Sequence, residues 1–222
     1  MLAGTAGRST EEAVGWTKFA KETGVDGAMV IPPYYNPPTE DELCGYYLDI
    51  AEAVDLPIMP YNNPTTSGVD MSPEFIHRLH STIDSISCVK EASGDARRVQ
   101  SMLSLIGDDL VVFWGEETAI SAALALGARG WISGSANIIP EKCSRLFDLL
   151  VGNGNLAGAW RIHRQLFPLL VECESKKWLT IIKAGIDLRG EIRAGAPRKP
   201  MLPLGTEERE RLRSMVERAL EA

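Results

Sequence analysis

The chain has 222 residues, of which 45% are hydrophobic, and it carries a formal net charge of −7. A chain of this length can form one substantial domain or two small ones. Its basic residues are scattered, which argues against nucleic-acid binding because that function needs a basic stripe or patch. No apolar run approaches the ~20 residues that span a bilayer, and the N-terminal residues lack the pattern of a signal peptide.

The cysteines and histidines do not predict a metal site. The four cysteines form no CxxC pair, so we expect reduced thiols in a cytoplasmic protein. His77 and His80 are three residues apart on one predicted helix, but no carboxylate pattern accompanies them. We therefore expect no metal, no membrane association and no nucleic-acid partner.

Short apolar runs alternate with longer amphipathic runs as far as residue 151. Strands are predicted at 1–5, 27–31, 57–61, 86–90, 110–114 and 130–133. Helices are predicted after them at 10–23, 40–53, 72–80, 95–106, 118–126 and 140–151. Three further helices, near 155–172, 177–188 and 206–221, follow without strands between them. The expected domains are therefore a partial β/α barrel over 1–153 and a C-terminal helical extension over 154–222.

Six β/α units with nearly all-apolar strands indicate a parallel sheet covered by helices. An open doubly wound sheet and a β/α barrel both satisfy this pattern. Polar residues follow almost every predicted strand, not one switch point, and this favours the barrel. A complete barrel has eight strands and about 250 residues. We therefore expect an α/β fold of the TIM (β/α)8 type that is shortened at its N-terminus to about six units.

Lys90 is the strongest candidate for a catalyst. It ends a predicted strand in the stretch SISCVKEASGD. An amine at a strand end backed by apolar residues is partly desolvated, which disfavours its charged form. A neutral amine can attack a ketone and form a Schiff base, which then serves as an electron sink for breaking a neighbouring bond. The alternative is an ordinary strand-end lysine that extends into solvent or pairs with Glu91.

Two tyrosine-containing stretches lie at neighbouring predicted strand ends. Tyr61 ends a strand in PYNNP, and Tyr34 and Tyr35 lie in IPPYYNPP. A phenol beside an amine can transfer a proton to or from it. Each tyrosine alone is also typical of an amphipathic residue with a buried ring. Because neighbouring parallel strands direct their ends to one edge, Lys90 and these tyrosines together predict a site.

The stretches PPYYNPPTEDEL, PIMPYNNPTTSGVDMSPE, VKEASGD and GWISGSANIIPE resemble the dihydrodipicolinate synthase / N-acetylneuraminate lyase family of lysine-dependent class I aldolases. Their order and spacing match the family over essentially the whole chain. The resemblance implies a (β/α)8 barrel with C-terminal helices that assembles as a homodimer or homotetramer. It also implies a 2-keto acid substrate and no cofactor beyond the covalent Schiff base itself.

The resemblance assigns roles to five residues of this sequence. Lys90 resembles the lysine that forms the Schiff base with pyruvate or another 2-keto acid. Tyr61 resembles the tyrosine that relays protons beside it, and Tyr35 the tyrosine contributed across the tight-dimer interface to the neighbouring site. Gly115 and Ile132 occupy positions whose backbone lines the substrate pocket.

Two features depart from the family pattern. The Gly-Thr-Thr-Gly-Glu motif after the family's second strand is absent, and GTAGR at residues 4–8 is placed after the third family strand by its distance from PPYYN. We therefore expect the first two β/α units to be missing. In addition, the resemblance to true dihydrodipicolinate synthases implies an arginine that can bind an acidic substrate at the position where this chain has Thr66.

The predicted activity is that of a Schiff-base-forming lyase, an aldolase or dehydratase, acting on pyruvate-type or 2-keto-3-deoxy sugar acid substrates. Thr66 and Glu117 are the expected substrate-binding residues. Glu117 could accept hydrogen bonds from sugar hydroxyls, and the alternative is that it is a solvated loop acid. One alternative is a dihydrodipicolinate synthase proper, and another is a catalytically impaired, truncated homologue. A third is a doubly wound binding protein without enzymatic activity.

Overall fold

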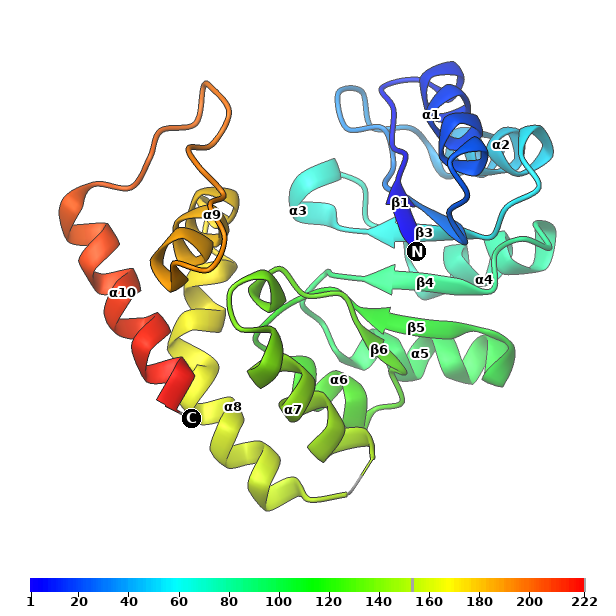
Figure 1. Cartoon of the computed structure of the whole chain (residues 1–222). Helices are drawn as coiled ribbons and strands as arrows, with labels where there is room; N and C mark the ends of the chain where they lie inside the picture. Colours follow the sequence, from blue (N-terminus) through cyan, green and yellow to red (C-terminus); the bar gives the residue numbers. More distant parts are fainter. Residues whose placement is uncertain (153, 222) are drawn as a thin grey trace. The chain divides into compact units, whose positions relative to one another are not determined.

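The computed structural model describes residues 1–152 and 154–221 and contains one six-stranded sheet (Figure 1). The strands are β1 (Leu2–Gly4), β2 (Gly27–Val30), β3 (Ile58–Asn62), β4 (Cys88–Glu91), β5 (Val111–Trp114) and β6 (Gly130–Trp131). The helices are α1 (Thr10–Glu22), α2 (Glu40–Ala53), α3 (Pro64–Ser67), α4 (Pro73–Thr82), α5 (Arg97–Ile106), α6 (Ile120–Ala125), α7 (Pro140–Val151), α8 (Leu156–Cys173), α9 (Trp178–Arg189) and α10 (Thr206–Glu221).

The chain forms two compact units. The first unit holds Met1–Gly115 and Leu126–Gly130, and the second holds Glu116–Ala125 and the described residues from Trp131 onward. The predicted domain boundary at 153/154 includes residue 153, which lies outside the described residues. None of the helices described is both long and apolar enough to cross a membrane.

The sheet has its strands in sequence order, β1-β2-β3-β4-β5-β6, and the neighbours from β1 to β5 pair in parallel. In the first unit the helices follow the same order, with α1 packed on α2, α2 on α4 and α4 on α5. A doubly wound sheet would reverse its strand order at a switch point. The structure therefore confirms a parallel β/α fold with six strands and contradicts the doubly wound alternative.

Helix starts in the first unit follow the local signals in the sequence. The Ser9 side chain accepts a hydrogen bond from Glu12 N at the start of α1, and Ser72 does the same for Phe75 N before α4. Thr39 and Glu42 form a reciprocal capping box at α2. Such caps satisfy backbone N–H groups that have no partner inside the helix.

The strand interiors form the core of the first unit. Val30, Ile58, Val89 and Val112 each have 0% of their surface exposed. Tyr47 of α2 is also fully buried, and its hydroxyl donates to the Val30 carbonyl over 2.9 Å. This packing fixes α2 against β2 and leaves the carboxyl ends of the strands to carry polar residues.

The observed elements differ from the predicted ones mainly at their ends. The strand predicted at 86–90 is β4, Cys88–Glu91, and the strand predicted at 130–133 is reduced to Gly130–Trp131. Helix α3 was not predicted, because its four residues are too few to show a helical period. It depends on local chemistry instead, with Asn63 as the N-cap, Pro64 at the first position and Gly68 at φ 70° ending it.

In the second unit, α8 packs against α7, α9 and α10. Its inward face contributes Leu166, Leu169 and Leu170, which are at most 1% exposed, and α10 contributes Leu212 and Val216. The helices expected near 155–172, 177–188 and 206–221 are therefore confirmed as α8, α9 and α10.

Candidate active site

Lys90 and Tyr61 lie directly opposite each other at the ends of two paired strands. The register of β3 and β4 pairs Tyr61 with Lys90, and Asn62 with Glu91. Lys90 Nζ lies 3.9 Å from the centroid of the Tyr61 ring, and the Lys90 residue is only 7% exposed. A cation over an aromatic face is attracted by the ring's negative charge density. The amine is thus held in a defined place at the strand ends while most of its surface is removed from solvent.

The turn after β3 fixes the other side of Tyr61. Asn63 Nδ2 donates to the Tyr61 hydroxyl over 2.9 Å, while Asn63 Oδ1 accepts from Thr66 N over 3.2 Å. One side chain therefore caps α3 and also orients the phenol. Thr66 is exposed on this short helix, and its backbone N–H is used in the cap.

Gly115 follows β5 and faces Lys90. A Cβ atom added at Gly115 would lie 2.4 Å from Lys90 Cε and 3.0 Å from the Cβ of Ala92. Cβ atoms essentially never approach other atoms within 3.0 Å. The lysine side chain therefore needs glycine at this place in order to extend past the end of β5.

Behind the Lys90–Tyr61 pair lies a buried hydrogen-bond network that starts from Glu91, which is 1% exposed. Its carboxylate accepts from Asn62 Nδ2 over 2.9 Å and from Ser93 N over 2.6 Å. Arg98 Nη1 lies 4.0 Å from the same carboxylate, and Arg98 binds Asp70 through Nη1 and Nη2. Burial raises the pKa of Glu91 above its usual value, while the hydrogen bonds from Ser93 and Asn62 act in the opposite direction.

Tyr35 lies in the segment between β2 and α2 and is 82% exposed. The resemblance expects this residue to act in a neighbouring subunit, and such a role requires it to extend away from its own chain. The assignment stays a prediction, because a single chain does not test it.

Ile132 and Glu117 belong to the second unit. Ile132 is half-buried directly after β6. Glu117 is 4% exposed, and its carboxylate accepts four hydrogen bonds from the turn at residues 133–135, which follows β6. The donors are Gly134 N at 2.5 Å, Ser135 N at 3.1 Å, Ser133 Oγ at 2.9 Å and Ser135 Oγ at 2.5 Å. This geometry favours a role in holding the 133–135 turn, while binding of sugar hydroxyls by Glu117 stays a prediction.

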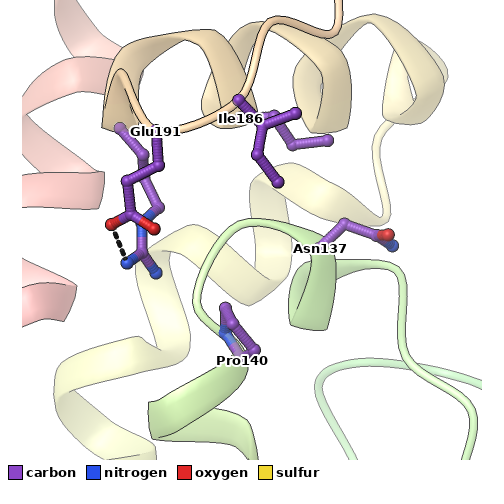
Figure 2. A pocket seen from close by; sticks show the side chains of 6 residues that line it. Asn137, Pro140, Ile186 and Glu191 are labelled. Carbon is purple, nitrogen blue, oxygen red and sulfur yellow. Dashed lines mark hydrogen bonds and ion pairs between the residues drawn. The ribbon is translucent and has the colours of Figure 1, made fainter.

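Figure 2 shows a pocket in the second unit. Asn137, Pro140, Ile186, Arg189, Glu191 and Ile192 line it. The Arg189 guanidinium donates to Glu141, Glu191 and the Ile138 carbonyl. These partners come from the chain itself, so the arginine serves to join α9 to α7 in this unit.

The sequence analysis missed the network of Asn62, Glu91 and Arg98, although all three residues belong to the recognised stretches or follow them. One signal was available: Asn62 and Glu91 are polar residues that directly follow the strands predicted at 57–61 and 86–90. Two buried polar groups in adjacent strands are expected to bond to each other. Arg98 lies on α5, and its partners could not be inferred without the fold.

Comparison with known sequences shows one consistent relationship. A sequence model of the Dihydrodipicolinate synthetase family matches residues 1–219. The chain is 38% identical over 213 residues to 4-hydroxy-tetrahydrodipicolinate synthase of Syntrophobacter fumaroxidans, covering 96% of this chain and 72% of the relative. It is 37% identical over 219 residues to the enzyme of the same name from Acidithiobacillus ferrooxidans, covering 99% and 74%.

Solved structures agree with the sequence matches. The dihydrodipicolinate synthase of Cyanidioschyzon merolae, with lysine bound, superposes with a TM-score of 0.93 at 29% identity, covering 100% of this chain and 74% of that one. YagE, a prophage protein of E. coli K12 in complex with pyruvate, superposes with a TM-score of 0.92 at 26% identity, covering 100% and 75%. These matches span the described strands and both compact units.

Proposed function

The chain belongs to the dihydrodipicolinate synthetase family, whose members are lyases of the class I aldolase type, and from this premise we propose that Lys90 forms a Schiff base with pyruvate. The observation that carries the proposal is the buried Lys90 amine, held 3.9 Å from the ring centroid of Tyr61 at the ends of two paired strands. An amine placed in this way is poised to meet a small ketone at the edge of the sheet.

In the proposed reaction Lys90 Nζ attacks the keto carbon of pyruvate and forms a C=N bond, and the carbonyl oxygen leaves as water with two protons that the Lys90 ammonium group gives up. The resulting iminium accepts the electron pair that is released when a methyl proton is removed, which gives a nucleophilic enamine. The Tyr61 hydroxyl accepts a hydrogen bond from Asn63, and its own O–H serves as the donor toward the departing oxygen. The covalent adduct replaces any separate cofactor.

For the second substrate we propose aspartate semialdehyde, whose aldehyde carbon the enamine attacks to form the new C–C bond. The names of the curated relatives support this choice over the sugar acids favoured by the sequence analysis. Thr66 is the one observation that favours a 2-keto-3-deoxy sugar acid, because threonine cannot bind a carboxylate bidentately as arginine does. We retain sugar acids as the second candidate on this ground.

Borohydride trapping tests the Schiff base directly. The purified protein is incubated with pyruvate and borohydride, and the adduct is located by peptide mass spectrometry. We expect one adduct on Lys90, none in Lys90→Met, and an unchanged yield in Lys18→Met, which alters an exposed lysine of α1. A folded wild-type protein without an adduct would contradict the proposal and favour the catalytically impaired homologue.

The choice of second substrate needs its own assay. After trapping is established, consumption of pyruvate is measured with aspartate semialdehyde, and pyruvate release is measured from 2-keto-3-deoxy sugar acids. Turnover with aspartate semialdehyde alone supports the first candidate, and turnover of a sugar acid alone supports the second.

We also propose that the protein acts as a homodimer or homotetramer, in which the exposed Tyr35 reaches a neighbouring subunit. Light scattering after size exclusion measures the oligomeric state. Tyr35→Ala should then lower the rate of trapping or the stability of the oligomer. A monomer that traps pyruvate at the full rate, with or without Tyr35, would contradict this part of the proposal.

A further inference from the structure

Pro60 interrupts the backbone hydrogen bonds between β3 and β4, one residue before Tyr61. Residues two apart in a strand present their backbone groups to the same neighbouring strand. Ile58 N donates to Ser85 O, and Asn62 O accepts from Ala92 N, each over 2.9 Å, so both face the β4 side. Pro60 lies midway between them and has no N–H to donate. The two strands therefore lose a ladder bond beside the catalytic pair.

A side-chain bond joins the same strands at the adjacent register pair. Asn62 and Glu91 face each other across β3 and β4, and Asn62 Nδ2 donates to Glu91 Oε2 over 2.9 Å. Asn62 Oδ1 accepts from Met71 N over 2.9 Å, and Glu91 Oε1 accepts from Ser93 N over 2.6 Å. Asn62 is 0% exposed and Glu91 1%, so water does not compete for these bonds.

We propose that Glu91 and Asn62 form a clamp of positioning residues that holds the ends of β3 and β4 together where Pro60 leaves the ladder incomplete. The proposal rests on the Schiff-base function proposed for Lys90. Because successive residues of a strand point to opposite faces, the clamp lies on the face opposite to Lys90 and Tyr61 and does not touch the substrate. It acts by keeping β3 and β4 in register, so that Lys90 Nζ stays 3.9 Å from the centroid of the Tyr61 ring.

Arg98 extends the clamp toward the surface. Its guanidinium donates to both carboxylate oxygens of Asp70, at 2.7 and 2.6 Å, and to the Met71 carbonyl at 3.1 Å. It also lies 4.0 Å from Glu91 Oε2. Arg98 thus holds the 70–71 segment, whose Met71 N–H in turn orients Asn62. Its side chain is 19% exposed, so a change there disturbs the fold less than a change at Glu91.

The first test measures the rate of borohydride trapping of pyruvate in Glu91→Gln. Glutamine keeps the size of the side chain but replaces one acceptor oxygen by an NH2 group, so either Asn62 Nδ2 or Ser93 N loses its acceptor. We expect the trapping rate at saturating pyruvate to fall about 10-fold or more, with half-saturation within about threefold of wild type, because only the catalytic geometry changes. Ile76→Val, which trims a buried side chain of α4, is the control for a general loss of stability.

The second test restores the missing backbone donor. Pro60→Val adds an N–H in a residue of high strand propensity. The double variant should therefore trap pyruvate at least about threefold faster than Glu91→Gln alone. In the otherwise wild-type protein Pro60→Val should change the rate by less than about twofold. A role of Glu91 that is unrelated to the joining of β3 and β4 predicts no such recovery. Failure of Pro60→Val to recover any of the lost rate in folded double variants would overturn the clamp.

The two proposals fail in different ways. A wild-type protein without an adduct overturns the Schiff-base function and the clamp with it. A wild-type adduct together with Glu91→Gln trapping within twofold of wild type overturns the clamp alone. If circular dichroism shows that Glu91→Gln does not fold, Arg98→Lys is tested in its place. Lysine keeps the charge but loses the bidentate contact with the Asp70 carboxylate. About threefold slower trapping then supports the clamp, and an unchanged rate overturns it.

Discussion

Substituting Gly115 by alanine should separate catalysis from stability. The new Cβ would lie 2.4 Å from Lys90 Cε and 3.0 Å from Lys90 Cγ. Ordinary contacts begin at 3.4 Å, so the end of the lysine chain must move by about 1.0 Å, the difference between 3.4 and 2.4 Å. Because Cε belongs to a flexible side chain, the lysine can move without a large shift of the sheet.

The magnitude follows from this displacement. A misplacement of about 1 Å in a reacting group can lower a rate about 100-fold, which corresponds to about 2.7 kcal/mol of transition-state stabilisation. Overpacking by one methyl group against a movable side chain should destabilise the fold by only about 1 kcal/mol. We therefore expect a loss of catalysis much larger than the loss of stability.

The assays are the rate of borohydride trapping with pyruvate and the free energy of unfolding from urea titration. Gly4→Ala is the matched control, because Gly4 ends β1 and has no atom within 4 Å of the added Cβ. It should leave the trapping rate unchanged. Trapping by Gly115→Ala at the wild-type rate would refute the argument, since Lys90 would then not depend on the space at Gly115.

Two further predictions concern stability. Gly45 lies in the middle of α2 with open space around its added Cβ, so Gly45→Ala should raise the free energy of unfolding in urea by about 0.5–1 kcal/mol, and a decrease would contradict the assignment of a regular helix there. Burial raises the pKa of Cys88 and Cys143 to about 11 from the usual 9.0, so the folded state keeps thiol protons that the unfolded chain releases. The contribution of these two thiols to stability should then be constant below about pH 9 and should fall as the pH rises from about 9 to about 11. Cys143→Ala should flatten this fall in urea titrations across the same range, and an unaltered slope would count against the pKa assignment.

The sequence predicted the β/α alternation because the apolar runs are short and regularly spaced, and the polar residues after almost every strand favoured a barrel over a doubly wound sheet. It also placed Lys90 and Tyr61 at neighbouring strand ends, and the register of β3 and β4 confirms that they face each other. The contact of Lys90 with the face of the Tyr61 ring could not be predicted. It depends on side-chain rotamers and on the space left at Gly115, which no pattern in one sequence describes.

The role of Pro60 illustrates what periodicity leaves out. In the sequence, Pro60 was read as part of an apolar strand, and proline within a run of residues usually argues against a central strand. In the structure Pro60 lies within β3, and the Asn62–Glu91 side-chain bond joins β3 and β4 on the side where the N–H is missing. The general rule against proline in a central strand thus has an exception at Pro60, where the side chains of Asn62 and Glu91 join the same two strands.

Glu117 shows that a polar residue after a strand can hold a neighbouring turn, whether or not it also binds the ligand predicted for it. Its position after β5 suggested an acceptor for substrate hydroxyls, yet four donors from residues 133–135 occupy its carboxylate. A buried carboxylate must be compensated, and the nearest donors belong to the adjacent turn. Lys90 differs because its surroundings in the first unit are an aromatic face and a glycine, which hold the amine in place without bonding all of its donors. The comparison suggests a physical criterion for candidate sites: a functional group should be positioned by its neighbours while its reactive atom still has bonding capacity to offer a substrate.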